Sequence, residues 1–144
     1  MEIKDNHSIE IIRSLIQVLM HKLFRIKSKG YENLGDNKYQ LQFIALQELI
    51  EKNCFESKKV SYYANLMGVT TRTLNNITKS ITAKHAKALI DEIVILQIKR
   101  LLINSELTFT EIAYQAGFDD PTNFFKYFRK MTGYSPKQFK ENYK

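Results

Sequence analysis

The sequence contains one short pattern twice, and this repeat restricts the fold more than any other feature of the chain. In each copy an alanine is followed four residues later by a glycine, and six or seven residues after that by a large apolar residue. The first copy is Ala64, Gly68 and Leu74, and the second, 49 residues further on, is Ala113, Gly117 and Phe124.

This pattern is typical of a helix-turn-helix. Alanine lets a second helix cross closely over the first, glycine ends the first helix with a positive φ, and the apolar residue anchors the second helix. Thr70 or Thr71 in the first copy, and Asp119 or Asp120 in the second, can cap the helix that follows, where Pro121 suits the first turn. Any tight corner between helices can produce one such pattern, but two copies favour a pair of helix-turn-helix units.

Apolar spacing predicts helices for most of the remaining chain. Only two prolines and five glycines interrupt 144 residues. Apolar residues at steps of three and four predict a first helix over 9–26, with Ser8 as its N-cap, and a second from about Tyr39 to Lys52. We expect a loop over Lys27–Asn37 and a polar connector over Asn53–Lys59.

Between the two copies of the repeat, Ala83–Ile103 predicts one long helix, at about 84–104. About 18 helical residues span roughly 27 Å, close to the roughly 34 Å between major-groove faces on one side of B-DNA. We therefore expect an all-α fold with helix-turn-helix units at about 60–80 and about 110–131. The long helix is expected to join the two helix-turn-helix units, and two N-terminal helices to precede them. The second helix of each helix-turn-helix unit is expected to enter one of two neighbouring turns of one DNA duplex.

The formal charge of +7 is unevenly distributed. Residues 121–144 carry six basic side chains and one acidic, whereas 36–120 are neutral overall. Within that neutral stretch, Thr71–Ala88 holds four basic residues and no acid: Arg72, Lys79, Lys84 and Lys87. Each basic stretch opens in one copy of the repeat. A solvated face is the alternative to a polyanion-binding surface.

Several classes of protein are excluded or disfavoured. One cysteine, Cys54, rules out an internal disulfide framework and is expected to be an inert thiol. His7, His21 and His85 are far apart, so we expect no metal site and no cofactor. No apolar run approaches the roughly 20 residues of a membrane span, and the N-terminus lacks the order of a signal peptide. We expect a cytoplasmic protein that is not an enzyme.

The second copy and its flanks resemble a known family. TEIAYQAGF at 110–118, DDPTNFFKYFRK at 119–130 and TGYSPKQF at 132–139 closely resemble the C-terminal signature of AraC/XylS-type transcription regulators. Ile98–Leu102 resembles the linker helix of that family, and Val60–Ile90 resembles its first helix-turn-helix less closely. The resemblance covers roughly residues 58–142.

The resemblance implies a seven-helix DNA-binding domain, here 36–144, that regulates transcription from double-stranded promoter DNA. RNA polymerase is a further candidate partner. Residues 1–35 are expected to be a helical connector or dimerisation segment, with a homodimer formed through residues 9–26 or through a missing N-terminal domain. We expect the chain to be the C-terminal part of a longer regulator, or a shortened version of one.

By match to the family, the first unit is expected to read bases through Arg72, Asn75 and Asn76 and to contact phosphate through Lys79. Arginine can bind guanine bidentately and asparagine adenine. Two departures weaken the match: Asn76 stands where the family commonly has arginine, and Ala83 where it has glycine. The alternative for Asn75 and Asn76 is a pair of solvated helix residues.

The second unit is expected to contact DNA from the helix that Pro121 begins, with Phe124 and Phe128 in the core. The base-reading candidates there are Pro121, Thr122, Asn123 and Lys126. The phosphate candidates are Thr110, Arg129, Lys130 and Ser135, because helix starts and basic side chains bind phosphate. A plain N-cap is the alternative for Ser135.

Two functions remain open at this point. The first is a sequence-specific transcription regulator that binds double-stranded DNA. The alternative is a helical interaction or dimerisation module of a larger regulator, with weak nonspecific DNA binding, because one face of the 9–26 helix is too apolar to stand alone in water.

Overall fold

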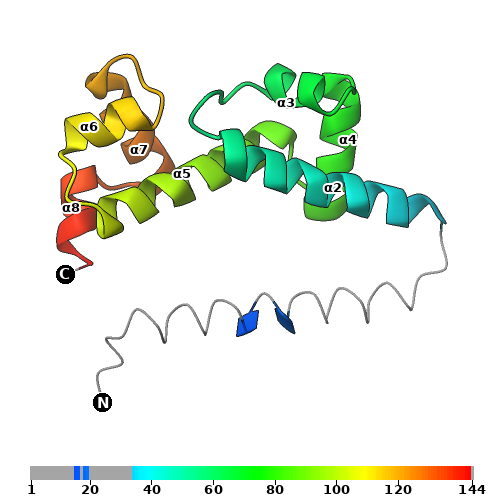
Figure 1. Cartoon of the computed structure of the whole chain (residues 1–144), viewed down its shortest axis with the longest axis horizontal. Helices are drawn as coiled ribbons and strands as arrows, with labels where there is room; N and C mark the ends of the chain where they lie inside the picture. Colours follow the sequence, from blue (N-terminus) through cyan, green and yellow to red (C-terminus); the bar gives the residue numbers. More distant parts are fainter. Residues whose placement is uncertain (1–14, 17, 20–33, 144) are drawn as a thin grey trace. The chain divides into compact units, whose positions relative to one another are not determined.

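The computed structural model describes residues 15–16, 18–19 and 34–143, which form helices and short turns (Figure 1). The chain divides into two compact units, residues 1–38 and 39–144. No strand occurs among the described residues, so the predicted all-α class is confirmed. The helices are α2 (Leu34–Asn53), α3 (Val60–Leu66), α4 (Thr71–Thr82), α5 (Ala86–Asn104), α6 (Phe109–Gln115), α7 (Pro121–Thr132) and α8 (Pro136–Glu141).

The first predicted helix, over 9–26, falls largely outside the described residues. Within it, Leu15, Ile16, Val18 and Leu19 are helical and exposed. The predicted loop over Lys27–Asn37 is wrong at its end, because α2 already begins at Leu34. Gly35 is compatible with that start, since the amides of a first helical turn have no partner inside the helix to lose.

The long helix α5 is the centre of the second unit. Eight of its 19 residues are buried and cover most of its circumference, whereas Glu92, Leu96 and Ile103 leave one narrow side exposed. Helices α3 and α4 pack against it, and so do α6, α7 and α8. In Figure 1 the first pair lies beside the beginning of α5 and the other three lie beside its end. The two helix-turn-helix units therefore share α5 as a common support.

Each copy of the repeat folds as its residues predict. Gly68 and Gly117 follow α3 and α6 with φ of +64° and +71°, values that favour glycine. Leu74 and Phe124 are fully buried. These residues bring α4 across α3 and α7 across α6, which confirms the two expected helix-turn-helix units.

The helix caps settle the alternatives that the sequence left open. The Thr70 hydroxyl accepts the amide of Thr73 at the start of α4, and the Asp120 carboxylate accepts the amide of Thr122 at the start of α7. Each bond satisfies one of the unpaired amides of a first helical turn. Thr70 and Asp120, rather than their neighbours in sequence, are therefore the N-caps.

The long helix begins later than the sequence predicts, at Ala86 rather than at 83 or 84. The cause is Ala83, which ends α4 with a left-handed φ of +59°. A left-handed residue breaks the helical path, so the chain needs two more residues before α5 starts. The long helix does end at Asn104, where the apolar pattern stops.

Candidate nucleic-acid interface

Helices α4 and α7 each present one polar side to solvent. In α4 the buried residues are Leu74, Ile77 and Thr78, and in α7 they are Phe124 and Phe128. The opposite sides of both helices carry no acidic residue. Both helices therefore have the amphipathic form of a recognition helix, with one side in the core and the other side free for a partner.

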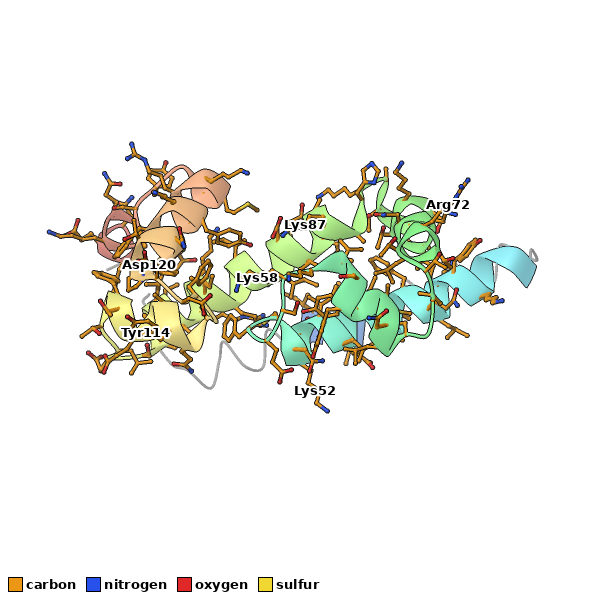
Figure 2. The ribbon with its side chains drawn as sticks, turned by 90° about the horizontal axis from the view of Figure 1, so that it is seen from above. Lys52, Lys58, Arg72, Lys87, Tyr114 and Asp120 are labelled. Carbon is orange, nitrogen blue, oxygen red and sulfur yellow. The ribbon has the colours of Figure 1, made fainter. Side chains whose placement is uncertain are left out.

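The exposed side of α4 gathers three of the predicted DNA contacts. Arg72, Asn76 and Lys79 follow one another at steps of four and three residues, so they lie on one face of the helix. All three are exposed. In Figure 2, Arg72 points outward from the upper edge of the view. The structure thus brings two base-reading candidates and one phosphate candidate together.

Asn75, the remaining base-reading candidate of the first unit, points elsewhere. Its side-chain oxygen accepts the backbone amide of Ala86 at 2.9 Å, and its side-chain nitrogen donates to the carbonyl of Thr71 at 3.1 Å. Asn75 therefore caps α5, whose first amides would otherwise lack a partner, because His85 makes no cap bond. This asparagine joins α4 to the long helix.

The exposed side of α7 gathers the candidates of the second unit. Thr122, Asn123, Lys126, Arg129 and Lys130 are all exposed and form one stripe along the helix. Figure 2 shows α7 (orange) toward the same upper edge as Arg72 and Lys87, whereas Lys52 and Tyr114 point to the lower edge. The two recognition helices therefore lie toward one side of the second unit.

The first turn of α7 is negatively charged at its cap and apolar beside it. Hydrogen bonds from Thr122 hold the pKa of the Asp120 carboxyl below its usual value, so the N-cap stays ionised.

Pro121 is the first helical residue, and it is half-buried. Phe125 lies edge-on to Phe109 and Phe124, with ring centroids 6.4 Å and 5.4 Å away. Neither Pro121 nor Phe125 offers a hydrogen bond to a base.

The two predicted helix-start contacts with phosphate lie at capped helix ends. Helix α6 is capped by Thr108, not by Thr110: Thr108 accepts the amide of Glu111, and Glu111 accepts the amide of Thr108. The spacing of Thr108 and Glu111 is that of a capping box, so the sequence already held this information. Ser135 caps α8 in the same reciprocal way with Gln138. Thr110 is exposed in the first turn of α6.

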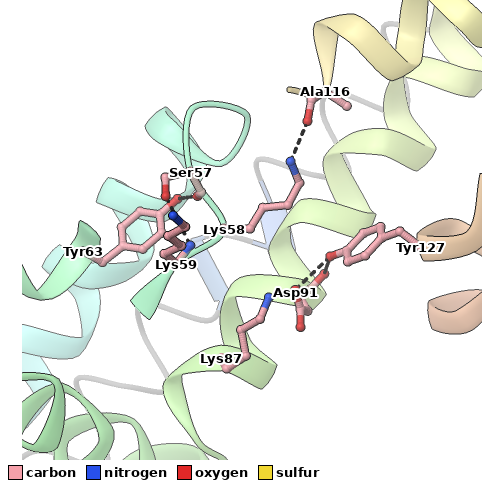
Figure 3. Close-up of polar contacts among 8 residues, drawn as sticks. All are labelled: Ser57, Lys58, Lys59, Tyr63, Lys87, Asp91, Ala116 and Tyr127. Carbon is pink, nitrogen blue, oxygen red and sulfur yellow. Dashed lines mark hydrogen bonds and ion pairs between the residues drawn. The ribbon is translucent and has the colours of Figure 1, made fainter. Parts of the chain in front are cut away.

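Polar bridges attach the second helix-turn-helix to the rest of the unit (Figure 3). On α5, Asp91 accepts the hydroxyl of Tyr127 from α7 at 3.0 Å and pairs with Lys87 at 2.5 Å. In the connector between α2 and α3, the ammonium of Lys58 donates to the carbonyl of Ala116 at 2.8 Å. Neither the Tyr127–Asp91 bond nor the Lys58–Ala116 bond was predicted from the sequence, because the partners lie 36 and 58 residues apart.

The described residues contain no group of three or more histidine, cysteine, aspartate or glutamate side chains that could hold a metal ion. Cys54 is buried, and burial raises the pKa of its thiol. No helix of the described part is long and apolar enough to cross a membrane.

Comparisons with known proteins agree with this geometry. The family model described as a helix-turn-helix domain matches residues 63–142, more than half of the chain. An uncharacterised HTH-type transcriptional regulator of Pseudoalteromonas carrageenovora is 35% identical over 94 residues, which cover 65% of this chain and 55% of that regulator. The chain thus spans about half the length of that relative.

Solved structures give the same result for the fold. The C-terminal domain of AraT, a response regulator from Geobacillus stearothermophilus, superposes with a TM-score of 0.61 at 25% identity, over 68% of this chain and 82% of that one. The DNA-binding domain of AdpA, a global transcriptional factor solved in complex with a target DNA, also gives 0.61, at 24% identity over 69% of this chain and 90% of that one.

Proposed function

Because this chain belongs to the AraC-type helix-turn-helix family, we propose that it binds double-stranded promoter DNA sequence-specifically and regulates transcription. The observation that carries the proposal is the placement of α4 and α7. Both helices expose a face without acidic residues, and both lie toward the same side of the second unit. The 19 residues of α5 span about 28 Å, close to the roughly 34 Å between successive major-groove faces.

In this proposal α4 reads one major groove through Arg72 and Asn76. Arginine pairs with the O6 and N7 of guanine, and asparagine with the N6 and N7 of adenine. Lys79, one helical turn further on, binds the phosphate backbone and fixes the register of α4. Asn75 is not assigned a base contact in this proposal, because its side-chain amide is hydrogen-bonded to Ala86 and Thr71. It instead supports the start of α5.

Helix α7 reads the next groove mainly through Thr122, Asn123 and Lys126, which lie in its first half. Arg129 and Lys130 lie in the last turn of the helix and bind phosphate. Pro121 contributes only apolar contact, for example with a thymine methyl group. Thr110 and Ser135 complete the proposed phosphate contacts at the starts of α6 and α8.

The test uses the full chain and a randomised duplex library. Repeated selection should enrich one bipartite sequence, and fluorescence anisotropy should then show tighter binding to it than to a scrambled duplex. Affinity should fall steeply as salt rises, because each neutralised phosphate releases counterions. The same affinity for all duplexes would leave only nonspecific binding, and the absence of salt-sensitive binding at low ionic strength would refute the proposal.

One observation favours the interaction module as an additional function. Leu15, Ile16, Val18 and Leu19 are helical and between 52% and 61% exposed, so an apolar surface is open to a second copy of the chain. Sedimentation of the full chain, compared with a Leu15→Lys and Leu19→Lys double variant, tests this. A dimer that the two substitutions dissociate supports the module, and identical monomers exclude self-association through this segment.

A further inference from the structure

The connector between α2 and α3, residues 54–59, contacts the turn between α6 and α7. The backbone oxygen of Phe55 lies so close to Gly117 that a Cβ atom at that position would be 2.0 Å from it. Only a residue without a side chain allows this approach. The connector, which belongs to the first half of the unit, therefore lies directly against the second helix-turn-helix.

Lys58 makes the polar part of this contact. Its ammonium donates to the carbonyl of Ala116 at 2.8 Å and to that of Gly117 at 3.4 Å, and it lies 4.1 Å from the ring centroid of Phe118. Hydrogen bonds from a charged group are stronger than neutral ones, and the C-terminal end of a helix attracts a cation. Burial lowers the pKa of Lys58, because removal from water disfavours the charged ammonium. The three contacts act in the opposite direction and stabilise that charge.

The other side of the connector is attached to the first helix-turn-helix. Tyr63 is fully buried in α3, and its hydroxyl donates to the carbonyl of Ser57 at 2.8 Å. The amides of Glu56 and Ser57 donate to the carbonyl of Asn53 at the end of α2. Lys58 therefore extends from a loop that is bonded to α2 and α3, and its ammonium reaches the end of α6 (Figure 3).

We propose that Lys58 is a positioning residue that sets the orientation of α7 relative to α4, and thereby the spacing of the two half-sites that the chain prefers. Ala116 and Gly117 end α6, and α7 begins four residues later, so the turn that Lys58 holds is the base of the second recognition helix. Apolar packing on α5 is not directional, whereas hydrogen bonds to these two carbonyls are.

This proposal rests on the proposed function, since half-site spacing has meaning only for DNA binding. Two measurements separate the two proposals. Residual dipolar couplings of the free, ¹⁵N-labelled full chain report whether α3–α4 and α6–α7 share one alignment tensor. Anisotropy with the selected bipartite duplex, and with duplexes whose spacer is one base pair longer or shorter, reports the spacing preference.

The variant is Lys58→Met, which keeps an unbranched apolar stem and removes the ammonium. Lys52→Met is the matched control, because Lys52 is exposed at the end of α2 and its loss removes the same charge. Lys58→Arg is the rescue, since arginine restores a charged donor. Circular dichroism at each temperature used shows that every variant remains folded.

We expect Lys58→Met to lower the discrimination between the best and the altered spacers about tenfold, and to change binding to an isolated half-site less than about twofold. Its two helix pairs should fit two different alignment tensors, while Lys52→Met behaves as wild type and Lys58→Arg recovers most of the preference. An unchanged spacing preference overturns the proposal. If the wild-type chain selects no sequence, the proposed function fails. In that case the dipolar couplings still test the orienting role, which is overturned if α3–α4 and α6–α7 of Lys58→Met share one alignment tensor.

Discussion

The side-chain oxygen of Asn75 in the first recognition helix accepts the backbone amide of Ala86 at the start of the long helix, at 2.9 Å. One residue of α4 thus completes the N-terminus of α5. The residue next to it, Asn76, is exposed and makes no such bond. The two adjacent asparagines therefore differ: Asn75 is half-buried and bonded to α5, whereas Asn76 is exposed and free for the proposed DNA contact.

Asn75→Ala should lower the free energy of unfolding by about 1 kcal/mol, because it removes the acceptor that caps α5. Urea denaturation followed by circular dichroism measures this loss. Asn76→Ala is the control and should change stability by less than about 0.5 kcal/mol, while weakening binding to the selected duplex. Full stability of Asn75→Ala together with lost base preference would instead make Asn75 a base reader.

Gly117→Ala should be far more destabilising than Gly68→Ala. Both glycines have a positive φ, so alanine costs about 1 kcal/mol of backbone strain at either position. Only at Gly117 does the added Cβ also meet the oxygen of Phe55, whereas nothing lies within 4 Å at Gly68. Thermal unfolding of the two variants gives the comparison, and equal losses would show that the connector moves aside without cost.

Ala83→Gly should stabilise the protein by about 0.5–1 kcal/mol. Ala83 has a φ of +59°, where an L-residue is strained and glycine is not. The matched control is Ala45→Gly in the middle of α2, which should destabilise by about 1 kcal/mol since glycine is a poor helix former. Chemical denaturation should therefore give opposite signs for the two substitutions. A destabilised Ala83→Gly would mean that chain entropy outweighs the strain.

Tyr63 should make the protein sensitive to alkaline pH. Burial raises the pKa of its hydroxyl above the ordinary value of 10.0, with Cys54 and Tyr62 adding to the effect. The unfolded chain then loses this proton at lower pH than the folded protein does. The contribution of the protonated Tyr63 hydroxyl to the free energy of unfolding is therefore complete below about pH 10, and it decreases as the pH rises further.

Tyr63→Phe tests this dependence. At pH 8 the variant should be about 1 kcal/mol less stable, because the hydrogen bond to Ser57 is lost. Its stability should then fall less than that of wild type between pH 8 and pH 11, measured by urea unfolding at both values. Tyr114→Phe, at an exposed position, is the control and should keep the wild-type difference. A Tyr63→Phe variant with the wild-type difference would contradict the assignment.

Lys126→Ala should weaken specific binding more than nonspecific binding, because Lys126 lies in the first half of α7 among the proposed base-reading residues. Arg129→Ala should weaken both about equally and reduce the slope of log affinity against log salt by about one. Titrations of the selected and the scrambled duplex at three salt concentrations separate the two patterns. Equal losses for Lys126→Ala would make it a phosphate contact.

The sequence predicted the features that depend on neighbours along the chain. The glycine turns at 68 and 117 and the burial of Leu74 and Phe124 follow from local geometry, which is why the repeat located both helix-turn-helix units. The late start of α5 was missed because the sequence does not show that Ala83 takes a left-handed conformation.

Contacts between distant segments could not be predicted in the same way. An exposed asparagine and one that caps another helix have the same chemistry, so nothing in the sequence separates Asn75 from Asn76. Lys58 is one of ten basic residues in the neutral stretch 36–120, and only the fold brings it to Ala116. The Thr108 cap is different, since its spacing from Glu111 could have been recognised.

The bond between Lys58 and Ala116 closes a loop of 58 residues, whereas most helix pairs of the second unit are neighbours in sequence. Closing a long loop costs more entropy than forming a local contact, so local helix pairs form before the connector docks. If the connector is released, we expect both helix pairs to remain folded on α5. On the proposed role of Lys58, the orientation of the two recognition helices is an equilibrium separate from the folding of either helix-turn-helix, and it can be lost in a protein that is still fully helical.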